Sequence, residues 1–283
     1  MFAIGGDLPV ARLGFGTMRL TGPGIWGEPA DRSGAVRVLR RAVELGVNLI
    51  DTADSYGPYV SESLVAEALH PYPPELVIST KGGLTRQGPD QWKAVGRPEY
   101  LRQCVEMSLR RLRLERIDLY HLHRIDPSVP LEDQLGELAS LRAEGKIRHI
   151  GLSEVTLDDL HAARRVVEVA SVQNIYNLAR QLYRDTLEYC TREEIAFIPF
   201  FPLGRGDLTR PGGELDSLAR CRGVSPSQLA LAWLLHLSPV VLPIPGTTRV
   251  AHLEDNLRAA QLSLAPDEVK ELTERWSDVL ATE

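Results

Sequence analysis

The sequence predicts a closed (β/α)8 barrel with a β-hairpin before it and an extra helix after it. Eight apolar, strand-like runs alternate with eight amphipathic, helix-like runs, and no linker interrupts them. The chain has 283 residues, close to the about 250 residues that such barrels use as one domain. Longer loops are expected after the first, third and seventh strands. We therefore expect residues 1–283 to form a single barrel domain.

The N-terminal part contains the hairpin and the first strand–helix pair. Residues 2–10 predict a hairpin, because two short apolar runs flank the turn at Gly5 and Gly6. Residues 13–18 predict the first buried strand. Residues 31–45 predict a helix that Gly46 ends. Apolar residues repeat at helical spacing in it: Ala35, Val38, Leu39, Ala42 and Leu45.

The same alternation continues along the chain. Apolar runs predict strands at residues 47–51, 76–81, 117–123, 147–153, 171–176, 195–203 and 240–244. Amphipathic runs predict helices at residues 61–69, 98–112, 131–142, 157–167, 184–194, 226–237, 251–259 and 266–280. Pro98, Ser225 and either Thr156 or Asp158 are typical of helix starts. The longer loops are residues 19–32, 82–97 and 204–217, on the side where barrels keep their sites.

Charge, cysteine spacing and hydropathy limit which partners and which cellular compartment the sequence is compatible with. The net charge of −6 and the pI near 5.7 argue against nucleic acid or an anionic membrane as a partner. Cys104, Cys190 and Cys221 are widely spaced, so neither a disulfide framework nor a metal site is expected. The N-terminus has no signal-peptide pattern, and no apolar run is long enough to span a bilayer. The sequence therefore predicts a cytoplasmic protein, with a monomer as the default.

Chemically useful side chains stand at the ends of three predicted strands. Asp51, Lys81 and His123 occupy these ends, and Tyr56 follows Asp51 closely. Barrel closure brings strand ends to one mouth, where a lysine lowers the pKa of a phenol and a carboxylate orients the lysine. A histidine there can hydrogen-bond a carbonyl oxygen. His121 lies deeper and is expected to be a core residue. The alternative is that Asp51 caps a helix and Lys81 is a paired charge.

The chain resembles the aldo-keto reductase family in short stretches that follow the family's order over nearly the whole sequence. They are Gly14-Phe15-Gly16-Thr17, Asn48-Leu49-Ile50-Asp51-Thr52-Ala53, Tyr56-Gly57, Ser79-Thr80-Lys81, Asp118-Leu119-Tyr120-His121-Leu122-His123, Gly151-Leu152-Ser153, Val172-Gln173-Asn174, Phe201-Pro202-Leu203-Gly204 and Ile244-Pro245-Gly246-Thr247 running to Asn256. The resemblance implies that Tyr56 is the general acid, that Lys81 and Asp51 tune it, and that His123 positions the substrate carbonyl.

The resemblance also implies a nicotinamide cofactor, because no side chain can donate a hydride. It implies that Ser153 and Gln173 bind the carboxamide and that Phe200 stands where the family usually has a tyrosine stacked on the nicotinamide. The remaining residues implied to line the cofactor are Gly16, Thr17, Met18, Phe201, Pro202, Leu203, Gly204, Gly206, Asp255 and Asn256.

The segment before the helix at residues 251–259 bears on the choice of cofactor. Gly246, Thr247 and Thr248 can hold a phosphate at the N-terminus of that helix. Arg249 can pair with a 2′-phosphate, so we expect NADPH rather than NADH; the alternative is a solvated arginine. The chain departs from the family at Glu154, where many members have an asparagine, and at Gly246, where a phosphate-binding lysine is frequent.

The expected function is NADPH-dependent reduction of an aldehyde or ketone to an alcohol. Small aldehydes and ketones, sugars, pyridoxal-type aldehydes and quinones all stay open as substrates. One alternative is a Schiff-base aldolase that uses Lys81. Another is a cofactor-binding regulatory protein without catalysis, because auxiliary subunits of potassium channels share this family's fold. The complete G-x-G-x-x-G fingerprint of open dinucleotide-binding sheets is absent after Gly14. Trp26 and Trp92 are candidates for an apolar wall of the substrate pocket or for packing of loops onto the barrel.

Overall fold

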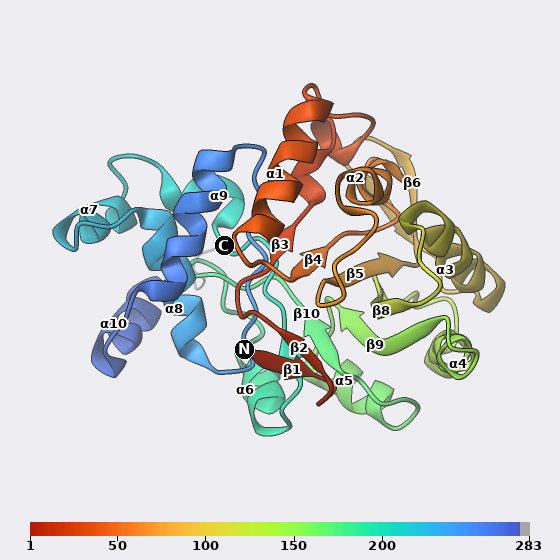
Figure 1. The fold of residues 1–283 in the computed structure, drawn as a ribbon. Coiled ribbons are helices and arrows are strands. Elements are labelled where there is room, and N and C mark those ends of the chain that lie inside the picture. Colours follow the sequence, from red (N-terminus) through yellow and green to blue (C-terminus); the bar gives the residue numbers. More distant parts are fainter. Residues whose placement is uncertain (278–283) are drawn as a thin grey trace.

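Seven parallel strands form a curled sheet in the computed structural model, which describes residues 1–277 (Figure 1). Their order is β11-β10-β9-β8-β5-β4-β3, so strands that follow one another in the barrel lie side by side. The strands are β3 (Phe15–Gly16), β4 (Leu49–Asp51), β5 (Val77–Gly82), β8 (Ile117–Leu122), β9 (Ile147–Ser153), β10 (Ser171–Gln173) and β11 (Ala196–Phe197).

The eighth segment closes the barrel without forming a regular strand. Val241 bridges Phe197 of β11 in parallel fashion. On the other side, the Gly14 amide donates to the Pro243 carbonyl at 2.9 Å. The prediction of a regular strand at residues 240–244 is therefore wrong. Pro243 and Pro245 have no N–H group to donate to a neighbouring strand, so a continuous ladder cannot form. The (β/α)8 class is nevertheless confirmed, since hydrogen bonds join both edges of the sheet to this segment.

The helices follow the strands as the sequence predicts. They are α1 (Arg32–Glu44), α2 (Val60–Leu69), α3 (Pro98–Leu112), α4 (Leu131–Ala143), α5 (Leu157–Arg164), α6 (Arg184–Arg192), α8 (Pro226–Leu237) and α9 (Val250–Leu257). Local capping explains several starts: Asp31 accepts from the Gly34 amide, and Thr156 forms a capping box with Asp159. The extra helix α10 covers Pro266–Ser277; the expected continuation to residue 280 lies outside the described residues.

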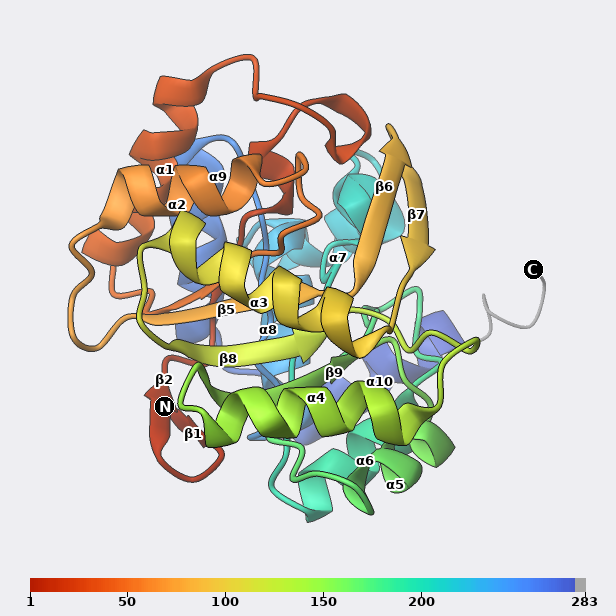
Figure 2. The same ribbon diagram turned by 90° about the vertical axis from the view of Figure 1, so that its right-hand side faces the viewer.

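The long loops contain structure that the sequence analysis missed. Loop 82–97 forms the antiparallel hairpin of β6 (Leu84–Gly88) and β7 (Gln91–Ala94), which projects beyond the strand ends in Figure 2. Loop 204–217 contains a 3-10 turn, η3 (Gly204–Thr209), and the start of α7 (Glu214–Cys221). Further 3-10 turns are η1 (Met18–Leu20), η2 (Pro23–Ile25) and η4 (Arg258–Gln261).

Three predicted strands end at least two residues earlier than expected. The first, expected at 13–18, is regular only over β3, because the 3-10 turn η1 begins at Met18. The expected strand at 195–203 has ladder pairs only over β11, and Pro199 then removes an N–H donor. The expected strand at 171–176 is regular only over β10. The backbone of these last two continues side by side, with an isolated bridge between Ile175 and Phe200.

The predicted N-terminal hairpin covers the opposite end of the barrel from β6 and β7 (Figures 1 and 2). It consists of β1 (Phe2–Ile4) and β2 (Leu8–Val10). Three of its apolar side chains pack against barrel-interior residues such as Leu49 and Leu242. The barrel is thus filled at this end, which leaves the carboxyl ends of the strands for a site.

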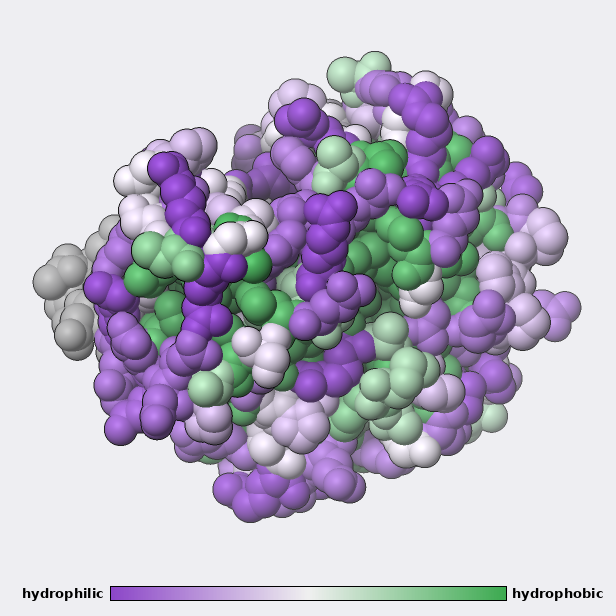
Figure 3. All heavy atoms as spheres, turned by 60° about the vertical axis from the view of Figure 1, so that its left-hand side comes forward, coloured by the Kyte–Doolittle hydropathy of each residue, from purple (hydrophilic) through white to green (hydrophobic). Residues whose placement is uncertain are grey.

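Hydrophilic side chains cover much of the face shown in Figure 3, with hydrophobic atoms visible between them. Among the helices of residues 1–277, none combines the length and the apolar character needed to cross a bilayer.

Candidate active site

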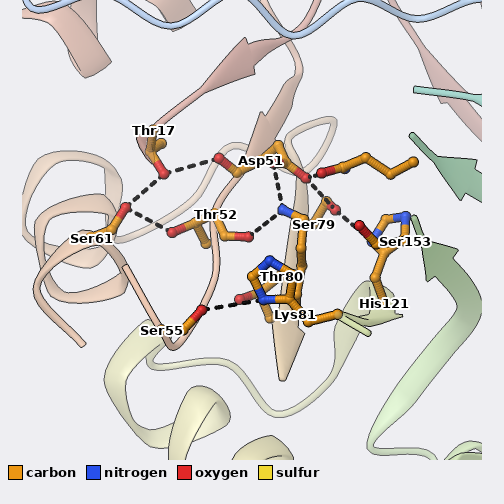
Figure 4. Close-up of polar contacts among 12 residues, drawn as sticks. Thr17, Asp51, Thr52, Ser55, Ser61, Ser79, Thr80, Lys81, His121 and Ser153 are labelled. Carbon is orange, nitrogen blue, oxygen red and sulfur yellow. Dashed lines mark hydrogen bonds and ion pairs between the residues drawn. The ribbon is translucent and has the colours of Figure 1, made fainter. Parts of the chain in front are cut away.

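Asp51 and Lys81 form a buried ion pair at the ends of β4 and β5 (Figure 4). The Lys81 ammonium donates to Asp51 Oδ1 at 2.6 Å and to the Thr52 carbonyl at 2.8 Å. The Lys81 side chain has no exposed surface. A charge this deep requires such partners, since a buried ion without them is very costly.

Side chains from β5 and β10 hold the second oxygen of the Asp51 carboxylate in place. Asp51 Oδ2 accepts from Ser79 Oγ at 3.0 Å and from Gln173 Nε2 at 2.9 Å. His121 contacts Ser79 and Ser171 through its two ring nitrogens. Burial and the charge of Lys81 hold the pKa of His121 well below its usual value. His121 is therefore a hydrogen-bonded core histidine, as the sequence predicts.

Tyr56 lies next to this ion pair, in the middle of the loop between β4 and α2. Its ring centroid is 5.3 Å from Lys81 Nζ and 5.9 Å from the ring of His123. The side chain is 7% exposed. Burial raises the pKa of Tyr56 above its usual value, and the nearby positive charge of Lys81 acts in the opposite direction. The phenol thus keeps its proton at neutral pH until a neighbouring atom takes it.

His123 completes the group directly after β8. Its Nδ1 lies 3.2 Å from Ser55 Oγ. Burial, followed by the charges of Arg124 and Lys81, holds the pKa of His123 well below its usual value. The imidazole is therefore neutral at pH 7, with one donor and one acceptor nitrogen. The structure thus brings Asp51, Tyr56, Lys81 and His123 together at one mouth of the barrel.

The β6–β7 hairpin brings an aromatic wall to this group. The Trp92 ring meets the rings of Tyr56 at 6.4 Å and His123 at 6.3 Å, both edge-on. The Arg86 guanidinium stacks 3.6 Å from the Trp92 ring and 5.6 Å from the Trp26 ring. Trp92 therefore borders the group of polar side chains, whereas Trp26 packs farther out.

A cavity of about 580 Å³ runs from Tyr56 towards the N-terminus of α9. Most of the residues that the sequence analysis assigned to a cofactor line it, together with Asp51 and Tyr56. They are Gly16, Met18, Gln173, Phe200, Phe201, Pro202, Leu203, Gly206, Gly246, Thr247, Asp255 and Asn256. Apolar side chains such as Phe200, Phe201 and Leu203 are among its lining residues, which suits an organic ligand.

Five of the assigned residues lie beside this cavity without lining it. Thr17 is buried and donates to the Asp51 carbonyl at 2.9 Å, so it supports the site from behind. Ser153 accepts from Arg124 at 3.0 Å. Gly204 lies in η3, and Thr248 and Arg249 are exposed at the start of α9.

The Glu154 side chain is hydrogen-bonded to the backbone just after the neighbouring strand, β10. Its carboxylate accepts from the Ile175 amide at 2.7 Å, and its own backbone has a φ of 54°. A side chain held in this way supports the turn after β9.

The cavity also has lining residues that sequence reasoning missed. They are Arg19, Thr209, Pro211, Pro226, Ser227, Ile244, Pro245 and His252. Arg205 lines it too, within the stretch from Leu203 to Gly206 that the resemblance implied. His252 had a usable signal, because it lies three and four residues before Asp255 and Asn256 and so shares their face of α9. Arg19 had no such signal: it meets Arg205 when the first and seventh loops approach each other, where Arg19 donates to the Arg205 carbonyl at 2.9 Å.

A long cavity beside a buried acid–lysine pair and a tyrosine, at the carboxyl ends of barrel strands, defines this protein as a barrel enzyme. The chain belongs to the aldo/keto reductase family, whose family model matches residues 12–277. It is therefore an oxidoreductase, as its motifs implied.

Named relatives and solved structures agree with this assignment. The chain is 52% identical to an uncharacterized oxidoreductase of Schizosaccharomyces pombe, over 95% of this chain and 88% of that protein. It is 41% identical to pyridoxine 4-dehydrogenase of Escherichia coli, over 93% of both chains. The structure of a glycerol dehydrogenase from Gluconobacter oxydans superposes with a TM-score of 0.84 at 30% identity, covering 97% of this chain and 93% of that one. An aldo-keto reductase from Klebsiella pneumoniae in complex with NADPH superposes with a TM-score of 0.81 at 27% identity, covering 94% and 91%.

Proposed function

We propose that this enzyme reduces an aldehyde or ketone to an alcohol with NADPH, and that its residues 1–283 act as one barrel domain. The observation that carries the proposal is the buried Asp51–Lys81 pair next to Tyr56. Such a pair stabilises the phenolate that forms as Tyr56 gives its proton away.

The residues of the cavity fit a nicotinamide dinucleotide. Phe200 offers an aromatic face near Tyr56, and Gln173 offers an amide beside Asp51. At the other end, Thr247 stands just before the N-terminus of α9, a favourable place for phosphate, and Asn256 lines the cavity from the last turn of that helix. The cofactor, when bound, supplies the hydride from C4 of its nicotinamide.

The chain's own residues supply the proton and the orientation. Neutral His123 donates a hydrogen bond to the substrate carbonyl oxygen and orients it towards Tyr56. As the carbonyl carbon gains the hydride, its oxygen takes the Tyr56 proton and becomes the alcohol. Lys81, fixed by Asp51, stabilises the resulting phenolate until solvent returns a proton.

The alternatives explain less of the geometry. A Schiff-base aldolase needs an accessible lysine amine, but the Lys81 amine is fully buried and donates to Asp51 and to a backbone carbonyl. A regulatory protein without catalysis leaves the convergence of four polar side chains at one mouth without a purpose.

The decisive experiment follows consumption of NADPH with a panel of aldehydes and ketones, for parent and Tyr56→Phe. Pyridoxal belongs in the panel because of the similarity to pyridoxine 4-dehydrogenase. We expect kcat to fall by about 10²- to 10⁴-fold without the phenol proton. Binding of NADPH, followed by its fluorescence, serves as the control and is expected to persist. A variant that keeps the parent's rate disproves the role of Tyr56.

We further propose that Arg249 selects NADPH. It is the exposed N-cap residue of α9, and its amide donates to Thr247 Oγ1 at 3.1 Å. A charge-assisted contact of this kind is worth about 1.5–3 kcal/mol, so Arg249→Ala is expected to raise the KM for NADPH roughly 10-fold or more. The KM for NADH is expected to stay unchanged. Arg165→Ala, on the exposed end of α5, is the matched control. An unchanged preference removes Arg249 from this role.

A further inference from the structure

Arg124 is the residue that follows His123, and it lies beside the candidate active site. Its guanidinium is 6.0 Å from the ring of Phe200, which lines the cavity. Its Nη1 donates to Ser153 Oγ at the end of β9, at the mouth of the barrel that carries Tyr56 and His123. Its positive charge lowers the pKa of both of these side chains.

The charge of Arg124 has no ionic partner. Within residues 1–277, no carboxylate oxygen lies within 4.0 Å of its guanidinium nitrogens, although other arginines form such pairs. Glu154 contributes a favourable charge from farther away, while its carboxylate accepts from the Ile175 amide. Burial lowers the pKa of Arg124, yet a guanidinium stays charged at neutral pH. A half-buried cation without a counter-ion is costly and calls for an explanation.

Comparison with Arg86 shows how many donors Arg124 leaves unused. Arg86 stands at the same mouth and donates through Nε, Nη1 and Nη2 to five backbone carbonyls. Arg124 donates through Nη1 alone, to the His123 carbonyl and to Ser153 Oγ. In the described part of the chain, its Nε and Nη2 have no hydrogen-bond acceptor. Arg86 is therefore fully used by the fold, whereas Arg124 has donors left for a ligand.

We propose that Arg124 is a specificity residue that binds an anionic oxygen of the carbonyl substrate. The inference rests on the proposed reductase function and names the class of substrate: an aldehyde or ketone that also carries a carboxylate, a phenolate or a phosphate. A guanidinium presents paired N–H donors that match such groups. Phe200, whose ring is 6.0 Å from the Arg124 guanidinium, and Tyr56, whose ring meets that of Trp92, both line the cavity. These rings suit a substrate with a flat, partly apolar body between its carbonyl and its anionic group.

Matched substrates test this proposal. Parent, Arg124→Gln and Arg124→Lys are assayed with 4-formylbenzoate and with 4-formylbenzamide, which has nearly the same shape without the charge. We expect the parent to prefer the anion in kcat/KM by about 10- to 100-fold, a typical range for charge-assisted bonds. Arg124→Gln is expected to bring the ratio close to one, and Arg124→Lys to keep part of it. An arm with 4-formylphenyl phosphate and one with pyridoxal, which carries a phenolate, show which anion is preferred.

Two controls keep the result interpretable. Arg165→Gln removes an exposed surface charge and is expected to leave the ratio unchanged. Calorimetry of benzoate and benzamide binding to the enzyme–NADP+ complex gives a readout without turnover. Only the affinity for benzoate is expected to fall in Arg124→Gln.

The outcomes separate this inference from the proposed function. Turnover of the neutral aldehyde without any preference for the anion upholds the reductase and overturns the role of Arg124. An equal loss for both aldehydes in Arg124→Gln also overturns it, because Arg124 then only positions Ser153 or the backbone of His123. Absence of turnover with every carbonyl compound in the panel overturns the proposed function itself.

Discussion

Asp54 is a buried carboxyl group two residues before Tyr56. Its Oδ1 has no hydrogen-bond partner among the described residues. Burial, helped by the negative charge of Glu62, raises the pKa of Asp54 to about 7. Asp54, in the same loop as Tyr56, therefore gains or loses a proton near neutral pH.

The raised pKa makes stability depend on pH in a definite direction. Between the unfolded value of 3.8 and the folded value of about 7, the folded state holds a proton that the unfolded state has lost. Stability must therefore fall as pH rises through this window. From pH 5 to 8 we expect Asp54 to account for a loss of about 2–3 kcal/mol in the free energy of unfolding, at about 1.4 kcal/mol per pKa unit. Urea unfolding of parent and Asp54→Asn at each pH isolates this contribution, since other groups titrate equally in both. Parallel curves for the two proteins would contradict it.

The sequence predicts which side chains gather at the site better than it predicts their partners. Asp51 and Lys81 could be placed because both stand at strand ends, and barrel closure brings strand ends together. The bond from Gln173 to Asp51 joins residues 122 positions apart. Neither residue type nor spacing in the sequence indicates that Gln173 and Asp51 form a hydrogen bond. The pairing depends on which side-chain rotamers fit in the packed barrel interior.

At the scale of elements, β6 and β7 were expected as a plain loop. The residues of β6 are polar after Leu84 and show no period-two pattern, and β7 alternates polar and apolar residues over four positions only. The turn at Gly88, Pro89 and Asp90 was a second local signal. The hairpin is ordered by a distant contact instead: Arg86 reaches the carbonyls of Gly24, Ile25 and Ser55 in other loops.

Loss of Arg86 is expected to loosen the hairpin and the wall that it carries. Arg86→Met removes five hydrogen bonds to backbone carbonyls and leaves Trp92 without its stacked guanidinium. We expect the KM for aromatic aldehydes to rise about 10-fold, in line with a loss of about 1–2 kcal/mol for a stacked cation. Trypsin should cleave after Lys93 faster than in the parent. Thr85→Ala, which removes two exposed hydrogen bonds within the hairpin, one to the Lys93 carbonyl and one from Gln87 Nε2, is the matched control. Unchanged KM and unchanged cleavage would show that the hairpin is held by other contacts.

At the scale of the whole molecule, the fold depends on how the barrel closes. The eighth segment lacks a full ladder because of its prolines, so backbone pairing alone holds it weakly. Arg12 provides the missing connection. Its Nη2 donates to the carbonyls of Leu235 and Ser238 at 2.6 Å and to that of Val241 at 3.3 Å. One cation thus ties the start of the chain to the end of α8 and to the closing segment, and it also compensates the unpaired carbonyls of a helix C-terminus.

Removal of this cation should destabilise the entire barrel. Arg12→Met keeps most of the aliphatic stem and loses the three carbonyl contacts, so that the Ser238 carbonyl keeps only the Val241 amide as a donor, at 3.3 Å. Bonds from a charged donor contribute about 1.5–3 kcal/mol each, and they are not additive when they share one nitrogen. The buried Nε without a partner reduces the net gain. We expect a loss of about 2–4 kcal/mol in the free energy of unfolding, with an unchanged slope against urea because the surface exposed on unfolding is the same. Arg37→Met, on the solvent side of α1, controls for a simple change of charge. If Arg12→Met unfolds at the same urea concentration as Arg37→Met, the closing segment is held by its few backbone hydrogen bonds and its apolar side chains instead.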